Sequence, residues 1–146
     1  MDVKSVQSVS AQPMPVEGAE GVTMRVMFSD QTGAPNFAMR VFEVKPGGHT
    51  PFHHHPYEHE ILILEGEGQL QSEKGPRPFK AGDAVYIAPD EPHQFKNTSG
   101  TSLKFLCMIP NKPPTQPFPT TPSLTLPHQG GGVGGGDGVS VGGCAA

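Results

Sequence analysis

The chain has 146 residues, a mass of 15.4 kDa and a net charge of −4 at pH 7, so its size suits a single domain. It contains no basic run that would bind nucleic acid or an anionic membrane surface, and no apolar segment long enough to cross a bilayer. The first residues also lack a basic stretch followed by an apolar one, the pattern of an export signal. We therefore expect a cytoplasmic protein whose partners are small molecules.

Short apolar runs of strand length recur along most of the chain, and several alternate apolar with polar residues. In chain order, the predicted strands lie within residues 21–28, 36–44, 60–66, 68–73, 83–89, 93–97 and 102–109. The segments between them are rich in Gly, Pro, Asn and Asp, which favour turns, and no helical periodicity is sustained over three turns. This pattern predicts an antiparallel all-β sandwich or barrel.

The last quarter of the chain has a different composition. Of the 19 glycines and 17 prolines, 16 follow Ile109. Proline removes backbone donors and favours an extended conformation, and glycine runs favour flexibility. We predict an N-terminal extension over residues 1–20, a β domain over 21–110, and a disordered Pro-rich and then Gly-rich tail over 111–146.

One short stretch, residues 47–68 (GGHTPFHHHPYEHEILILEGEG), concentrates histidines just before an apolar run. Alternation along an extended chain places His53, His55 and His59 on one face and turns the neighbouring carboxylates to the other. The residues that follow on the same face are Ile61 and Ile63, which suit the inside of a barrel. Neutral imidazoles beside apolar side chains are typical of a transition-metal site.

A fourth histidine, His93, lies further along in PDEPHQF. A run of three histidines would also fit a solvated loop, but its position within a strand-and-turn pattern and the additional His93 favour metal binding. The residue types do not identify the metal, because imidazole binds Mn, Fe, Ni, Cu and Zn.

The spacing of these histidines and of the nearby glycines is similar to the two sequence motifs of the cupins. The first motif is matched by Gly47, His53, His55, His59 and Gly66, and the second by Gly82, Pro89, His93 and Asn97. His59 stands where the motif usually has glutamate. The chain therefore resembles the small single-domain cupins whose metal is held by four histidines, which implies a cupin-type β-barrel (a double-stranded β-helix), a manganese or iron ion, and a homodimer.

The same alternation gives candidates for the walls of a substrate pocket: Phe37, Met39, Ile61, Ile63, Phe95 and Phe105. Tyr57 and Cys107 are candidates for a catalytic role. Tyr57 follows the histidine run and could donate a hydrogen bond or act as a base, although a surface tyrosine fits the same position. Cys107 shares its face with Phe105, where it would be either a redox-sensitive thiol or a small buried apolar residue.

Four neutral ligands leave a divalent ion its full charge, and an octahedral ion would keep two positions for water, substrate or dioxygen. We therefore predict one divalent ion, Mn²⁺ first and Fe²⁺ next, with Ni²⁺, Cu²⁺ and Zn²⁺ as further choices. The first hypothesis for the function is a metal-dependent oxygenase that acts on a small organic substrate. The alternatives are a non-redox lyase or isomerase, and a binding or sensing module without catalysis.

Overall fold

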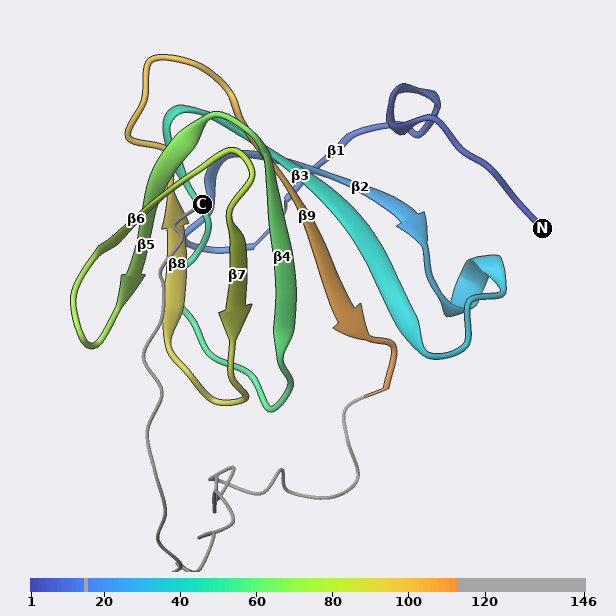
Figure 1. The fold of residues 1–146 in the computed structure, drawn as a ribbon. Coiled ribbons are helices and arrows are strands. Elements are labelled where there is room, and N and C mark those ends of the chain that lie inside the picture. The colour runs from blue at the N-terminus through green and yellow to red at the C-terminus, as the bar shows by residue number, and fades with distance from the viewer. Residues whose placement is uncertain (15, 113–146) are drawn as a thin grey trace, which may run out of the picture.

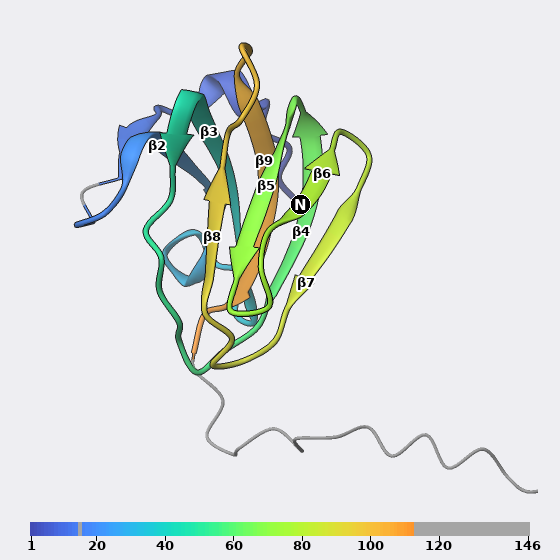
Figure 2. The same ribbon diagram turned by 90° about the vertical axis from the view of Figure 1, so that its left-hand side faces the viewer.

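The computed structural model describes residues 1–14 and 16–112. They form one strongly curled antiparallel sheet, which confirms the predicted all-β fold (Figures 1 and 2). The nine strands are β1 (Gln12–Pro13), β2 (Glu20–Phe28), β3 (Phe37–His49), β4 (His59–Glu65), β5 (Glu67–Ser72), β6 (Arg77–Lys80), β7 (Ala84–Ile87), β8 (His93–Lys96) and β9 (Leu103–Pro110). Helical structure in the described part is limited to two short 3-10 turns, η1 (Val6–Ser8) and η2 (Asp30–Thr32), and no helix there could span a membrane. The predicted tail lies outside the described residues from position 113 onward.

The curl of the sheet comes mainly from β3, which takes part in both walls of the molecule. The strand order is β6-β5-β8-β3-β9-β4-β7, and β2 also pairs with β3. Most of β3 pairs with β2 and β9, whereas its last residue, His49, pairs with Lys96 of β8. The two views show β4, β9, β3 and β2 on one side and β5, β6 and β8 on the other. A cavity can therefore lie between the walls.

The N-terminal segment adds to this sheet. Gln12 of β1 pairs with Met24 of β2, and the backbone N–H of Met14 donates to the carbonyl of Val22 at 3.0 Å. Gln12 and Pro13 lie within the predicted N-terminal extension over residues 1–20, and there they add a short strand to the edge of β2. Met14 and Val16 beyond this strand line the cavity between the walls.

The core between the walls is aliphatic and aromatic. Its aromatic part is a series of stacked rings: Phe42 and Phe105 have centroids 5.1 Å apart, and Phe95 and Phe105 have centroids 4.8 Å apart. Burying a side chain of this size contributes on the order of 1.5–3 kcal/mol. The stacked rings also form the base of the cavity.

Two residues of the two sequence motifs, Gly66 and Asn97, have structural roles at the ends of strands. Gly66 has a φ of +82°, and a Cβ there would lie 2.6 Å from the carbonyl oxygen of Ser102, so no other residue fits this turn. Asn97 is buried after β8, where its Nδ2 donates to the carbonyls of Val44 at 2.9 Å and Thr101 at 2.7 Å. These bonds hold β8, and therefore His93, beside β3.

Candidate metal centre

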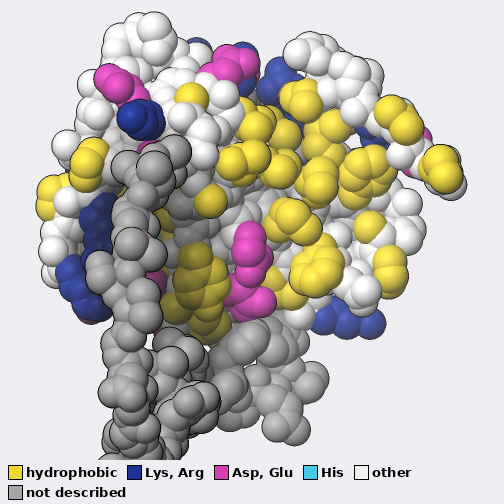
Figure 3. Space-filling model, viewed as in Figure 1, with side chains coloured by type: hydrophobic (Ala, Val, Ile, Leu, Met, Phe, Trp, Pro, Cys, Tyr) yellow, Lys and Arg dark blue, Asp and Glu magenta, His cyan; other side chains and the backbone are white. Residues whose placement is uncertain are grey.

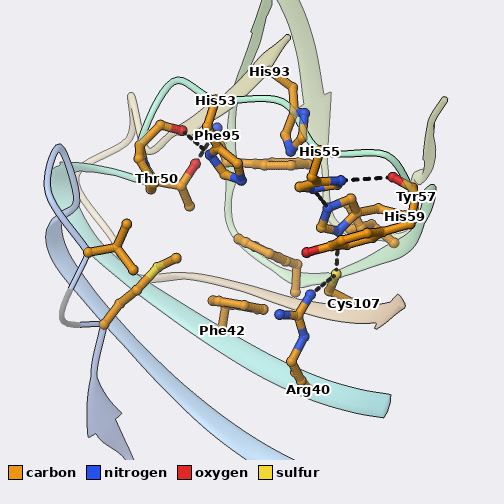
Figure 4. Close-up of a pocket in the computed structure, with 15 residues that line it drawn as sticks. Arg40, Phe42, Thr50, His53, His55, Tyr57, His59, His93, Phe95 and Cys107 are labelled. Carbon is orange, nitrogen blue, oxygen red and sulfur yellow. Dashed lines mark hydrogen bonds between the residues drawn. The ribbon is translucent and has the colours of Figure 1, made fainter. Parts of the chain in front are cut away.

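The four predicted histidines reach one place from three parts of the chain. His53 and His55 lie in the connection after β3, His59 is the first residue of β4, and His93 is the first residue of β8. The backbones of His53 and His93 exchange two hydrogen bonds, of 3.2 and 3.0 Å. This isolated bridge fixes the loop against β8, so that the side chains meet at one end of the cavity (Figure 4).

The imidazole rings are in contact with one another. Ring centroids lie 4.8 Å apart for His53 and His93, 4.4 Å for His55 and His59, and 5.1 Å for His59 and His93. The nitrogens that His53, His55 and His93 offer lie within 4.8 Å of one another, a spacing that suits one ion. His59 is outside that group of three but touches it, because its Nε2 lies against Nε2 of His55.

Three of the imidazoles are oriented by backbone carbonyls, a feature that residue spacing does not predict. Nδ1 of His53 bonds the carbonyl of Pro51 at 3.0 Å, and Nδ1 of His55 bonds that of Tyr57 at 2.8 Å. Nδ1 of His93 bonds the carbonyl of Glu91 at 2.8 Å. A carbonyl only accepts, so each Nδ1 carries the hydrogen and each Nε2 is left with a free lone pair. This arrangement is typical of metal-binding histidines.

His59 is oriented differently, by a thiol. Its Nδ1 lies 2.9 Å from Sγ of Cys107. A thiol can donate or accept, so either tautomer of His59 is satisfied. Its Nε2 can therefore donate to His55 in the absence of an ion, or present a lone pair to one. Cys107 is 1% exposed, and its burial raises the pKa of the thiol, which favours the S–H form.

Burial also favours the neutral form of three imidazoles, those of His55, His59 and His93. It lowers the pKa of His93 to about 4 and that of His59 to about 2, and it lowers the pKa of His55 as well. The neighbouring imidazoles act in the same direction on His59, since they would repel a second positive charge. Metal ligands must be unprotonated, so the donor set fits a divalent cation at neutral pH.

A cavity of about 180 Å³ adjoins the imidazoles. Its walls include Ile61, Phe95 and Phe105 from the predicted set, together with Phe42, and the N-terminal residues Met14 and Val16 close one side. No aspartate or glutamate is among the described residues that line it. The cavity therefore suits a small organic molecule with an apolar part.

Three predicted pocket residues lie elsewhere. Phe37 is 51% exposed and Met39 does not line the cavity, because β3 turns the opposite set, Arg40 and Phe42, inward. Assigning Phe37 and Met39 to the pocket was therefore wrong by one position along the strand. Ile63 is buried in the core but does not reach the cavity.

Tyr57 and Cys107 both line the cavity. The ring of Tyr57 stacks on that of His55, with centroids 3.9 Å apart and planes 8° apart. The phenol is therefore held beside the imidazoles. His54, between His53 and His55 in the chain, points away from the cavity and is exposed. Its Nδ1 lies 4.0 Å from Oδ1 of Asp90.

The chain is similar to known proteins over most of its described length. Residues 40–109 match the family model for a cupin domain. A curated relative, 1-methylthio-D-xylulose 5-phosphate methylsulfurylase from Rhodospirillum rubrum, is 33% identical over 72% of this chain, which spans 66% of that protein, just under two thirds.

Solved structures show the same similarity. The polyketide cyclase RemF from Streptomyces resistomycificus superposes with a TM-score of 0.74 and 34% identity, covering 78% of this chain and 82% of that one. A predicted oxalate decarboxylase from Thermotoga maritima has a TM-score of 0.67 and 26% identity, covering 75% of this chain and 98% of that one.

Proposed function

Since this chain belongs to the cupin superfamily, we propose that it is a metal-dependent enzyme acting on a small organic substrate. In this proposal, one divalent transition-metal ion is held by Nε2 of four histidines, His53, His55, His59 and His93. The observation that carries it is the orientation of the rings: each Nδ1 has a partner outside the cluster, the ligand nitrogens of His53, His55 and His93 lie within 4.8 Å of one another, and Nε2 of His59 lies against Nε2 of His55.

Manganese is the first choice for this ion and iron the second, as the resemblance to four-histidine cupins implies. The ligand set supports a catalytic ion over a structural one, because four imidazoles leave an octahedral ion with two further positions. The cavity beside the imidazoles gives a substrate access to those positions.

The chemistry that we now favour is non-redox, with a carbonyl compound as substrate. A divalent ion bound by four neutral ligands keeps its full charge and would act as a strong Lewis acid. In this proposal the stacked aromatic side chains exclude water and orient the substrate, and the phenol of Tyr57, which lines the cavity and stacks on His55, gives or takes a proton. Two similar proteins are named for methylsulfurylase and polyketide cyclase activity, and neither name describes an oxygenase.

An oxygenase is the second candidate. Its support is the apolar cavity, which would hold dioxygen and an organic substrate away from water. Dependence on oxygen separates the two chemistries. Turnover of a diketone or phenol by the metal-loaded protein that continues under nitrogen supports the non-redox reaction, and turnover that stops without dioxygen supports the oxygenase.

The metal site itself is tested by elemental analysis of the purified chain. We expect about one Mn or Fe per chain, and more than about 100-fold weaker binding in His93→Ala, since removing a ligand costs more than removing a group that orients one. His54→Ala is the matched control, because His54 lies in the same loop and faces solvent. Equal metal content in His93→Ala and the parent protein would contradict the proposal and leave a binding or scaffold role.

A homodimer is also part of the proposal. The outer face of β4 and β7 carries the exposed apolar side chains Leu62, Leu64 and Tyr86, and Figure 3 shows hydrophobic side chains spread over this side of the molecule. Patches of this kind commonly mark interfaces. Light scattering should give a mass twice that of the 15.4 kDa chain. Leu62→Glu should give the mass of one chain. Val3→Glu at the exposed N-terminus should leave the mass of the dimer unchanged.

A further inference from the structure

Arg40 carries a permanent positive charge into the cavity, a feature that the sequence pattern did not indicate. Its side chain comes from β3, and Figure 4 shows it reaching toward Cys107 and Phe42. Nη2 donates to Sγ of Cys107 at 3.2 Å, and the guanidinium lies over the ring of Phe42, 5.1 Å from its centroid. Both partners are weak, because a neutral thiol is a poor acceptor and an aromatic face only partly compensates a charge.

No carboxylate in the described part of the chain forms an ion pair with Arg40. Its Nε is buried and has no acceptor there either. Arg25 on the neighbouring strand shows the ordinary arrangement, with Glu43 at 3.5 Å and the carbonyl of Val9 at 3.1 Å. Burying a cation without a counter-ion costs free energy. A negatively charged ligand in the cavity would offset that cost.

We propose that Arg40 binds a carboxylate of the substrate, which makes the natural substrate a small organic acid. The acid would lie against the guanidinium, its apolar part against the rings of Phe42 and Phe105, and its reactive end at the imidazoles. Only that last placement depends on the proposed function. The absence of lining carboxylates removes any group that would repel the acid, and the cavity of about 180 Å³ limits its size.

A carboxylate fits this position better than a phosphate. The planar guanidinium matches a planar carboxylate with two parallel hydrogen bonds. Phosphate sites, in contrast, usually gather several backbone N–H groups around the anion, and Arg40 is the single permanently charged donor among the described lining residues.

The proposal is tested by calorimetric titration of the full chain, metal-free and manganese-loaded, with three pairs of probes that differ in charge but little in shape. The pairs are formate and formamide, acetate and acetamide, and benzoate and benzamide; inorganic phosphate is a separate probe. For at least one pair we expect the acid to bind about 10 to 100 times more tightly than its amide, the range for a charge-assisted hydrogen bond.

Arg40→Gln should reduce that preference to within about twofold while keeping its metal content and melting temperature, and Arg40→Lys should keep part of it. Arg25→Gln, which removes an arginine from the other face of the sheet, should leave it intact. The proposal is overturned if no acid is preferred by the parent protein, if Arg40→Gln retains the preference, or if phosphate binds more tightly than every acid. The metal-free titration separates the two proposals, because a chain that takes up no metal but prefers acids through Arg40 contradicts only the metal site.

Discussion

The two faces of the sheet around β3 and β9 carry very different chemistry. On the inner face, Arg40, Cys107 and His59 form a connected polar chain enclosed by aromatic rings. On the outer face, Arg25 and Glu43 form an ordinary half-buried ion pair. The comparison indicates that the cavity side of this sheet is marked by polar groups with weak or missing partners, and a group already satisfied has little left to offer a ligand.

The largest expected effect that distinguishes the faces is on stability. Phe105→Ala removes a ring stacked on both Phe42 and Phe95 and should lower the free energy of unfolding by about 3–5 kcal/mol. Leu62→Ala on the outer face, where 41% of the residue is exposed, should cost less, about 1 kcal/mol. Urea denaturation of both variants measures this, and equal losses would mean that the inner face is not the core.

A smaller effect is expected at the thiol that orients His59. Cys107→Ala removes the partner of Nδ1 and should weaken metal binding by about 10- to 100-fold, the usual range for a group that orients a ligand. Cys107→Ser is the control, because a hydroxyl also donates and accepts. Competition with a chelator gives the affinities; if alanine and serine weaken binding equally, the volume of the thiol matters and its hydrogen bond does not.

The smallest effect is expected from pH in the metal-free protein. Burial lowers the pKa of His93 to about 4, below its ordinary value of 6.5, so the unfolded chain takes up the proton first as pH falls. This contribution to stability is complete above pH 6.5 and is lost progressively from there down to about pH 4. The urea midpoint of unfolding should therefore fall between pH 7.5 and pH 5. His93→Gln should reduce this dependence of the midpoint on pH. His54→Gln, at an exposed position, should leave it unchanged.

The sequence predicted the all-β fold because strand-length apolar runs and turn residues alternate along the chain. It also predicted that His53, His55, His59 and His93 would meet, and the structure brings their rings together. Both predictions rest on local spacing, which the backbone geometry of a strand converts directly into faces. The ligation of an ion by these four residues remains a prediction.

The inward face of β3 could not be predicted in the same way. In the run FAMRVFEV, apolar residues occupy both sets of alternating positions, and each set carries one charge, Arg40 or Glu43, so residue type alone does not select the inward set. The structure turns the set with Arg40 inward, because that set also contains Phe42, which completes the aromatic core. The carbonyl partners of the imidazoles and the thiol beside His59 depend on tertiary packing, which residue spacing does not encode.

The position of Met14 and Val16 has a consequence for how this scaffold diversifies. They form part of the cavity wall but precede residues 40–109, the segment that matches the cupin domain. A short leading peptide can therefore be exchanged without disturbing the histidines or the carbonyls that orient them. The part of the cavity wall that Met14 and Val16 form is therefore encoded apart from Arg40 and the histidines, and it can change while they are retained.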